Sequence, residues 1–275
     1  MSAPRPDPAL GIFETLLVVD GEPIALDAHL ARMSASARQL FGDAAEARTR
    51  GPARALAEAR VREAGSASGP RAAGAGRPAG VTDPRPSPAL GRLRLAVAPD
   101  ARGGLDVSAT VATVDSAIVF PPLEEAPELV PVTIAGGLGS HKWADRRLVE
   151  AAAARAGEGA TEGAGTLPLI VDQDGSVLEA ERASVFAVID GALFTPPDDG
   201  RILPGVTRAR VSELARGLGL EVREAGLSLA ALADASEVFL TGSVRGIEPV
   251  RTTGAPSVTE RLATELRSRW LRPAA

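Results

Sequence analysis

The sequence predicts an α+β protein of two domains, with a smaller N-terminal α/β domain over residues 1–122 and a strand-rich C-terminal domain over residues 123–275. Three observations support this prediction. The chain has 275 residues, of which 45% are hydrophobic and 24% are charged, so it is long enough to form two packed cores. Both halves mix helical and strand patterns, and the second half has more strands. A stiff, polar connector at residues 120–127 separates them.

The first predicted elements are a β-hairpin and a helix. Residues 12–19 and 22–26 are rich in apolar and β-branched residues, and the Asp20-Gly21 pair between them is typical of a type I′ turn. Asp27 is placed to cap the helix that follows. The apolar residues of this helix recur at helical spacing: Leu30, Met33, Ala37 and Leu40.

Residues 64–90 interrupt these patterns. The segment is dominated by Gly, Ala, Pro and Arg and contains few large apolar residues, so it is expected to form a disordered, mobile loop. Two strands are predicted after it, at residues 92–97 and 107–114, and they complete the N-terminal domain.

The C-terminal half is expected to contain antiparallel β structure. Asp174-Gly175 and Asp190-Gly191 each separate two strand-like runs, which are two hairpin signals close together. A helix is expected to start after Pro204-Gly205. The remaining expected strands are 130–134, 167–172, 176–180, 184–190, 192–195 and 237–240, and the remaining expected helices are 146–156 and 257–271.

The composition argues against several classes of protein. A net charge of -5, scattered arginines and 3% aromatic residues without tyrosine do not fit a nucleic-acid partner. The absence of cysteine excludes disulfides and thiolate metal sites, and two histidines leave little for a histidine-based metal site. There is no apolar run that could span a membrane and no apolar signal core, so we expect a cytoplasmic protein.

One residue is chemically distinctive. The chain has 30 lysine and arginine residues, and Lys142 is the single lysine among them. Arginine stays protonated, whereas a desolvated lysine can lose its proton and form a Schiff base. Chance survival of one exposed lysine is the alternative interpretation.

A reactive lysine without a cysteine, a metal site or a nominated catalytic triad favours pyridoxal phosphate (PLP) as the cofactor, because PLP supplies an electron sink that side chains lack. A PLP site requires four features. It needs a Schiff-base lysine, a carboxylate at the pyridine nitrogen, a helix N-terminus with hydroxyl groups at the phosphate, and a cation or hydroxyl near the phosphate or the phenolate.

Eight short motifs occur in order between about residue 11 and residue 251. They are Gly11-Ile12-Phe13-Glu14-Thr15, His29-Leu30-Ala31-Arg32, Lys142, Leu178-Glu179 with Ser184-Val185-Phe186, Thr195-Pro196-Pro197, Ile202-Leu203-Pro204-Gly205-Val206-Thr207-Arg208, Ala235-Ser236-Glu237-Val238-Phe239, and Gly242-Ser243 with Pro249-Val250. Together they resemble the fold-type IV PLP enzymes. That family includes branched-chain and D-amino-acid aminotransferases and 4-amino-4-deoxychorismate lyase.

The resemblance implies roles for the matched residues. Lys142 would form the Schiff base with PLP and move the proton, and Glu179 would pair with the pyridine nitrogen. The implied phosphate ligands are Arg32, Val206, Thr207 and Ser243. Taken alone, these residues also fit ordinary structural roles, such as a strand-end carboxylate, an exposed helical charge, a helix cap or a turn serine. The resemblance further implies a homodimer with its active site in a cleft between two domains.

Two departures from the family pattern bear on the reaction. Ser184 replaces the usual asparagine of the glutamate motif, and the chain has no tyrosine to meet the cofactor phenolate. Lyase-like members tend to have an arginine there, and Arg146 and Arg147 are both candidates.

Residues 137–146 resemble aminodeoxychorismate lyases, which implies conversion of 4-amino-4-deoxychorismate to 4-aminobenzoate and pyruvate. Arg94 or Arg92 is then expected to bind a carboxylate of this small-molecule substrate. The alternatives are amino-group transfer from branched-chain or D-amino acids to a 2-oxo acid, and a non-catalytic protein that only binds PLP or a partner.

Overall fold

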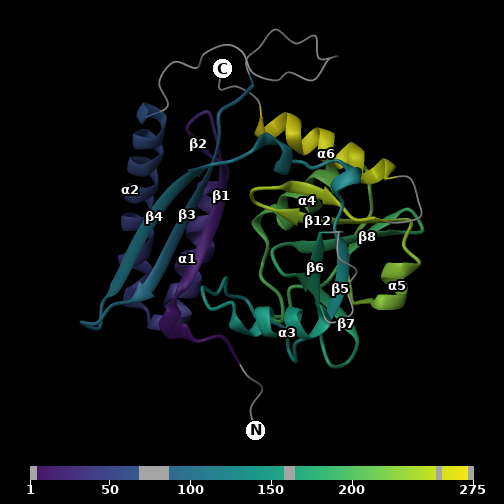
Figure 1. Ribbon diagram of the computed structural model, residues 1–275, viewed down its shortest axis with the longest axis horizontal. Helices are drawn as coiled ribbons and strands as arrows, with labels where there is room; N and C mark the ends of the chain where they lie inside the picture. The colour runs from purple at the N-terminus through teal and green to yellow at the C-terminus, as the bar shows by residue number, and fades with distance from the viewer. Residues whose placement is uncertain (1–4, 68–86, 158–164, 252–255, 272–275) are drawn as a thin grey trace.

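The computed structural model describes residues 5–67, 87–157, 165–251 and 256–271. The N-terminal half is one four-stranded antiparallel sheet with two helices packed against one face, and it lies beside a C-terminal half built from two further sheets (Figure 1). The order of strands in the first sheet is β2 (Glu22–Pro23), β1 (Ile12–Val19), β3 (Leu90–Pro99) and β4 (Leu105–Thr113).

The predicted hairpin between β1 and β2 is present, and its turn residues Asp20 and Gly21 both have positive φ, at 49° and 85°. The second strand is shorter than expected and ends at Pro23. The prediction that Asp27 caps the following helix was wrong. Helix α1 (Leu26–Phe41) begins directly after Ala25, which has left-handed φ and ψ, so Asp27 lies inside the first turn. Among the described residues, no side chain caps this helix.

Helix α2 (Ala44–Ala67) was not predicted from the sequence. Its buried face consists mostly of small residues spaced by four: Ala45, Thr49, Ala53, Ala57 and Val61. The predicted loop 64–90 was wrong at both ends, because residues 64–67 complete α2 and Leu90 opens β3. Residues 68–86 of that loop lie outside the described residues.

Strand β1 lies between two different environments. Ile12, Leu16 and Val18 pack with α1, α2 and β3 in one core. On the opposite face, Leu17 and Val19 pack with side chains of the C-terminal half. Both faces of the strand are therefore covered, which explains why its second half, residues 16–19, is a continuous apolar run rather than an alternating one.

The C-terminal half contains a five-stranded and a four-stranded sheet. The hairpins β6–β7 and β8–β9 confirm the antiparallel prediction, whereas the pairs β5–β6 and β9–β10 are parallel. The order of strands in the five-stranded sheet is β10 (Val222–Glu224), β9 (Ala192–Thr195), β8 (Ser184–Ile189), β12 (Glu237–Gly242) and β13 (Gly246–Pro249). The order in the four-stranded sheet is β11 (Leu227–Ser228), β7 (Ser176–Ala180), β6 (Thr166–Val171) and β5 (Glu128–Thr133).

Four helices accompany these sheets: α3 (Arg147–Gly157), α4 (Val206–Gly217), α5 (Leu229–Ala233) and α6 (Ser257–Trp270). The buried carboxylate of Glu237 on β12 caps α6, because it accepts hydrogen bonds from the backbone N–H groups of Val258 at 2.9 Å and Thr259 at 2.8 Å. Among the described helices, none is long and apolar enough to cross a lipid bilayer.

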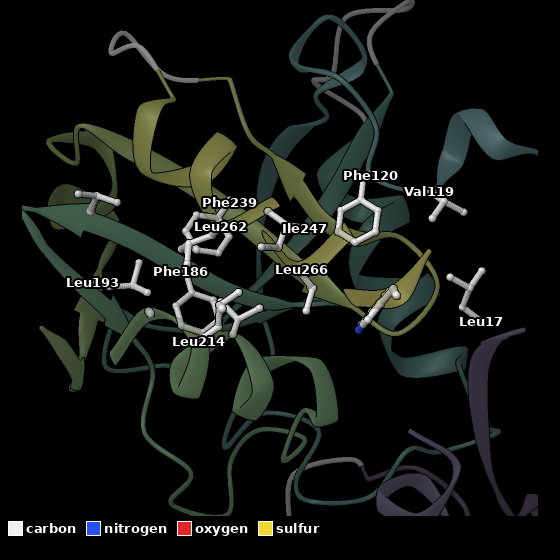
Figure 2. Close-up of a cluster of buried hydrophobic side chains, with 14 of the residues drawn as sticks. Leu17, Val119, Phe120, Phe186, Leu193, Leu214, Phe239, Ile247, Leu262 and Leu266 are labelled. Atoms are coloured by element: carbon white, nitrogen blue, oxygen red, sulfur yellow. The ribbon is translucent and has the colours of Figure 1, made fainter. Parts of the chain in front are cut away.

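One hydrophobic core joins the two halves of the molecule (Figure 2). Leu17 from β1 shares it with Phe186 and Phe239, whose rings stack with centroids 5.1 Å apart. Phe120, at the start of the predicted connector, is also buried in this core. The first residues of the connector are therefore packed rather than solvated, and the division into domains at residues 122 and 123 stays a prediction.

Candidate active site

A cavity of about 430 Å³ lies where the two halves meet. This volume is within the range of about 300–1,000 Å³ that is usual for small-molecule sites. The N-terminal sheet contributes Phe13, Thr15, Arg92 and Arg94, and α1 contributes Arg32. The C-terminal half and the segment before α3 contribute five further predicted residues: Lys142, Arg146, Val206, Thr207 and Ser243.

The edge of β1 that does not pair with β3 holds Lys142 and Ser243 in place. The backbone N–H of Phe13 donates to the carbonyl of Lys142 at 2.9 Å, and the N–H of Leu17 donates to the carbonyl of Ser243 at 3.0 Å. The backbone N–H of Ala144 also donates to the carbonyl of Gly11, at 3.0 Å. The site is therefore assembled by backbone hydrogen bonds between segments that are far apart in the sequence.

Lys142 has the electrostatic character expected of a reactive amine. Its Nζ lies 4.9 Å from the centroid of the Phe13 ring. Burial, together with the charges of Arg32 and Arg146, lowers the pKa of Lys142 from 10.5 to about 8, against the opposing effect of Glu14 and Glu179. A substantial fraction of the amine is therefore neutral at mildly alkaline pH.

Glu179 on β7 is buried next to this cationic group. Burial raises the pKa of its carboxyl from 4.5 to about 7, although Lys142, Arg146 and a backbone N–H oppose the rise. That N–H belongs to Leu203 and donates to Oε2 at 3.4 Å. Glu179 is not itself among the residues that line the cavity, whereas Leu203 is. Glu179 therefore lies behind the Leu203 backbone, and a cation in the cavity would stabilise its ionised carboxylate from the other side of that backbone.

The N-terminus of α4 opens into the cavity. Gly205 precedes the helix, and no side chain in the described part of the chain caps it, so the first backbone N–H groups have no side-chain acceptor among those residues. The hydroxyls of Thr207 and Ser243 lie 3.2 Å apart beside these groups. Backbone N–H groups, two hydroxyls and the positive end of a helix dipole together form a cradle that suits a phosphate.

Gly205 is required in this cradle for reasons of space. A Cβ atom at this position would lie 2.6 Å from Oγ of Ser184 and 2.9 Å from Cβ of Arg208. Ser184 is thus the residue on which the turn before α4 packs. Ser184 stands where the family usually has asparagine, and this contact gives it a packing role beside the turn.

Arg32 is held by a buried carboxylate that the sequence did not single out as functional. Its guanidinium donates to both oxygens of Glu14, at 2.8 and 2.6 Å, and to the carbonyl of Pro204 at 2.8 Å. His29 also contacts Glu14, through Nδ1 at 2.7 Å. Burial raises the pKa of Glu14, but Arg32 and His29 outweigh it and hold that pKa at about 2. Glu14 therefore stays ionised and fixes Arg32 beside α4.

The structure distinguishes between Arg146 and Arg147. Arg146 lines the cavity and donates to the carbonyl of Glu181 at 2.7 Å. Arg147 is exposed and pairs with Asp145 at 2.8 Å. Of the two, Arg146 is the one placed to meet a ligand in the cavity.

Arg94 and Arg92 lie on the face of β3 that looks away from the helices. The Arg94 guanidinium carbon lies 3.7 Å from the centroid of the Phe13 ring. Burial and the nearby charges of Arg92 and Arg146 lower the pKa of Arg94. Within the described part of the chain, no carboxylate forms an ion pair with either β3 arginine, so this wall carries positive charge that a ligand can neutralise.

These residues fit PLP. The α4 cradle and Arg32 suit its phosphate, Lys142 is a partly neutral amine, and Glu179 is a carboxyl whose ionisation a pyridinium would favour. No group of acidic and histidine residues in the described ranges is arranged to hold a metal ion.

Residues 11–253 match the profile of the family Amino-transferase class IV, so the chain belongs to this family. Members of the family bind PLP, which is the cofactor expected from the sequence. The architecture is that of the fold-type IV PLP enzymes, as predicted.

Solved structures agree on the fold. A fold IV transaminase from Curtobacterium pusillum superposes with a TM-score of 0.72 at 23% identity, covering 100% of this chain and 91% of that chain. The 4-amino-4-deoxychorismate lyase from Pseudomonas aeruginosa superposes with a TM-score of 0.70 at 22% identity, covering 99% and 96%. Transaminase and lyase thus resemble this chain equally well in backbone.

Sequence similarity to curated proteins is local. The branched-chain-amino-acid aminotransferase of Escherichia coli (strain K12) is 42% identical over 92 residues, which is 34% of this chain and 30% of that protein. The same protein of Salmonella typhimurium gives the same values. The chain therefore matches less than a third of the length of these relatives.

Proposed function

We propose that this protein is a PLP-dependent lyase that converts 4-amino-4-deoxychorismate to 4-aminobenzoate and pyruvate. The observation that carries the proposal is the concentration of guanidinium groups around Lys142. Arg94, Arg92 and Arg146 all line the same cavity, and two of them have no carboxylate partner among the described residues. Such a wall suits a substrate with several negative charges and disfavours an aliphatic side chain.

PLP, when bound, supplies the sink for the electrons released at the substrate carbon that bears the amine. The residues of the chain supply the rest. Lys142, with a pKa of about 8, removes the proton from that carbon and delivers a proton to the enolpyruvyl group as its carbon–oxygen bond breaks. The departing enol becomes pyruvate, and the ring becomes aromatic.

Glu179 and Arg146 control the charge around this step. Glu179 in its ionised form would pair with the pyridine nitrogen and keep it protonated. Arg146, which lines the cavity, would meet the cofactor phenolate in a chain that has no tyrosine, and its permanent charge would favour the anionic phenolate. Arg94, which stacks on Phe13, would hold a substrate carboxylate.

A second candidate function is amino-group transfer to a 2-oxo acid. The local similarity to branched-chain-amino-acid aminotransferases favours it, since 42% identity extends over 92 residues. Lys142, Glu179 and the phosphate cradle would act in the same way, and only the groups that bind the substrate would differ.

One pair of assays separates the two candidates. The purified protein with PLP is offered 4-amino-4-deoxychorismate, and 4-aminobenzoate and pyruvate are measured. It is then offered alanine, or branched-chain or D-amino acids, with 2-oxoglutarate. Release of 4-aminobenzoate and pyruvate in equal amounts supports the lyase. Transamination without 4-aminobenzoate would reject the lyase, and a protein that stays colourless with PLP and turns over neither substrate would be a non-catalytic member of the family.

We also propose, on the resemblance described above, that the protein is a homodimer. Light scattering coupled to size exclusion should give twice the mass of the chain, and a monomer mass at micromolar concentration would contradict the proposal.

A further inference from the structure

A second charged cluster lines the cavity from the C-terminal half. It consists of Arg182, which follows β7, Arg245, which lies between β12 and β13, and Glu248 on β13. Arg182 donates to both oxygens of Glu248, at 2.6 and 3.1 Å, and Arg245 Nη2 lies 2.8 Å from Oε1. One buried carboxylate thus orients two guanidinium groups at the cavity wall.

The charge of this cluster is not balanced. Two arginines and one glutamate leave a net charge of +1, and the side chain of Glu248 is only 3% exposed, so it cannot turn away to solvent. The Nε atom of Arg245 is buried and has no hydrogen-bond partner within the described residues. A buried N–H without an acceptor is costly, so the contacts within the described chain do not fully satisfy this guanidinium, which belongs to a residue of the cavity wall.

We infer that the Arg182–Arg245–Glu248 cluster is a second carboxylate-binding site, and that the substrate is a dicarboxylate held from both halves of the molecule. The inference rests on the proposed function, in which Arg94 of β3 binds one carboxylate. The second carboxylate faces the guanidinium groups of Arg182 and Arg245 in the cavity wall and neutralises the positive charge that Glu248 leaves over.

This arrangement gives the site a basis for selecting substrates by charge. A monocarboxylate with an aliphatic side chain would leave the net positive charge of Arg182, Arg245 and Glu248 uncompensated in a site closed by ligand, and buried charged groups that lack a partner discriminate strongly. A substrate with one carboxylate on its ring and a second on a side chain, as in 4-amino-4-deoxychorismate, satisfies both arginine groups at once.

The test uses two ring compounds that differ by one carboxylate, benzene-1,3-dicarboxylate and benzoate. Their affinities for the PLP-loaded protein are measured by calorimetry. The dicarboxylate should bind more tightly than benzoate, and Arg245→Gln should weaken the dicarboxylate by about 10- to 100-fold while it leaves benzoate nearly unchanged, as expected for loss of a hydrogen bond to a charged group. Arg182→Gln should act in the same direction.

Two further variants serve as controls for a general loss of positive charge. Arg245→Lys keeps the positive charge but loses the planar guanidinium with its several N–H donors. Its affinity for the dicarboxylate should therefore lie between those of Arg245→Gln and the wild type. Arg223→Gln, at an exposed position of β10, should leave both affinities unchanged. Equal binding of the two compounds by the wild type, or a dicarboxylate affinity that survives both Arg245→Gln and Arg182→Gln, would overturn the inference.

The outcome is separable from that of the proposed function. If 4-amino-4-deoxychorismate is not turned over but the Arg245-dependent preference for the dicarboxylate is found, the lyase proposal fails and the second carboxylate site stands. If 4-aminobenzoate is formed and Arg245→Gln leaves KM unchanged, the lyase proposal stands and the second site is rejected.

Discussion

Glu14 illustrates how a single buried charge organises this site. Its side chain points to the helix-covered face of β1, where an unpaired carboxylate would be very costly. Arg32 and His29 satisfy it, and the same contacts hold Arg32 beside the start of α4. Glu14 is therefore a positioning residue for the predicted phosphate ligand.

Glu14→Gln keeps the shape of the side chain but removes the charge that Arg32 neutralises. We expect the dissociation constant for PLP to rise by about tenfold or more, because a charge-assisted contact is lost and Arg32 is freed to move. The affinity for pyridoxal, which has no phosphate, should change little. Both affinities can be read from the visible spectrum, and an equal loss for the two compounds would show that the effect is merely structural.

Glu179 predicts a dependence of stability on pH. Its pKa is about 7 in the fold, against an ordinary value of 4.5. Because the folded pKa is raised, the contribution of this carboxyl to stability is full below about pH 4.5 and is lost as the pH rises through 7.

Urea unfolding of the protein without PLP should therefore show a difference between wild type and Glu179→Gln that changes with pH. Between pH 5 and pH 8 the wild type should lose on the order of 2 kcal/mol of unfolding free energy relative to the variant, whose amide does not titrate. A constant difference across this range would mean that Glu179 is not buried as described.

At the scale of elements, the start of α4 is the most constrained part of the site. Gly205 has an ordinary φ of -68°, so an alanine there meets no backbone strain. The obstacle is space, since the added Cβ would lie 2.6 Å from Ser184 Oγ.

Gly205→Ala should shift the helix N-terminus away from the cavity and weaken PLP binding by about tenfold, as overpacking of a tight contact does. The double variant Gly205→Ala with Ser184→Ala should recover part of the affinity, because it removes the nearest clashing atom. The comparison is made by titration with PLP. Wild-type affinity in the single variant would contradict the described packing.

Much of the element order could be predicted from the sequence, and the failures have physical causes. Strands β1, β7 and β9 match their predicted bounds, because Asp-Gly turns fix where hairpins reverse. Helix α2 was not predicted because alanine dominates its buried face, so the difference in hydrophobicity between its buried and exposed faces is small. Asp27 was misplaced because Ala25 adopts a left-handed conformation, which no propensity of alanine suggests.

At the scale of the whole molecule, the site exists because two halves share one core and one cavity. Leu17 of β1 belongs to the same hydrophobic core as Phe186 and Phe239 of the five-stranded sheet, so the two walls of the cavity are held in a fixed relation. The sequence motifs named most of the site residues, since they resemble a family. They could not reveal the pairing of Glu14 with Arg32, nor that Arg146 and not Arg147 turns inward, because both depend on contacts across the fold.

Lys142 is the amine on whose reaction with PLP the proposed chemistry depends. Its position as the single lysine permits a direct measurement, in which the protein is mixed with PLP, reduced with borohydride, digested, and analysed by mass spectrometry. We expect the phosphopyridoxyl group on the peptide that contains Lys142, and we expect Lys142→Ala to lose both this label and the corresponding visible absorbance, with turnover reduced by about a thousandfold. A label that appears only at the chain's N-terminal amine, or an absorbance and turnover that persist in Lys142→Ala, would contradict the account.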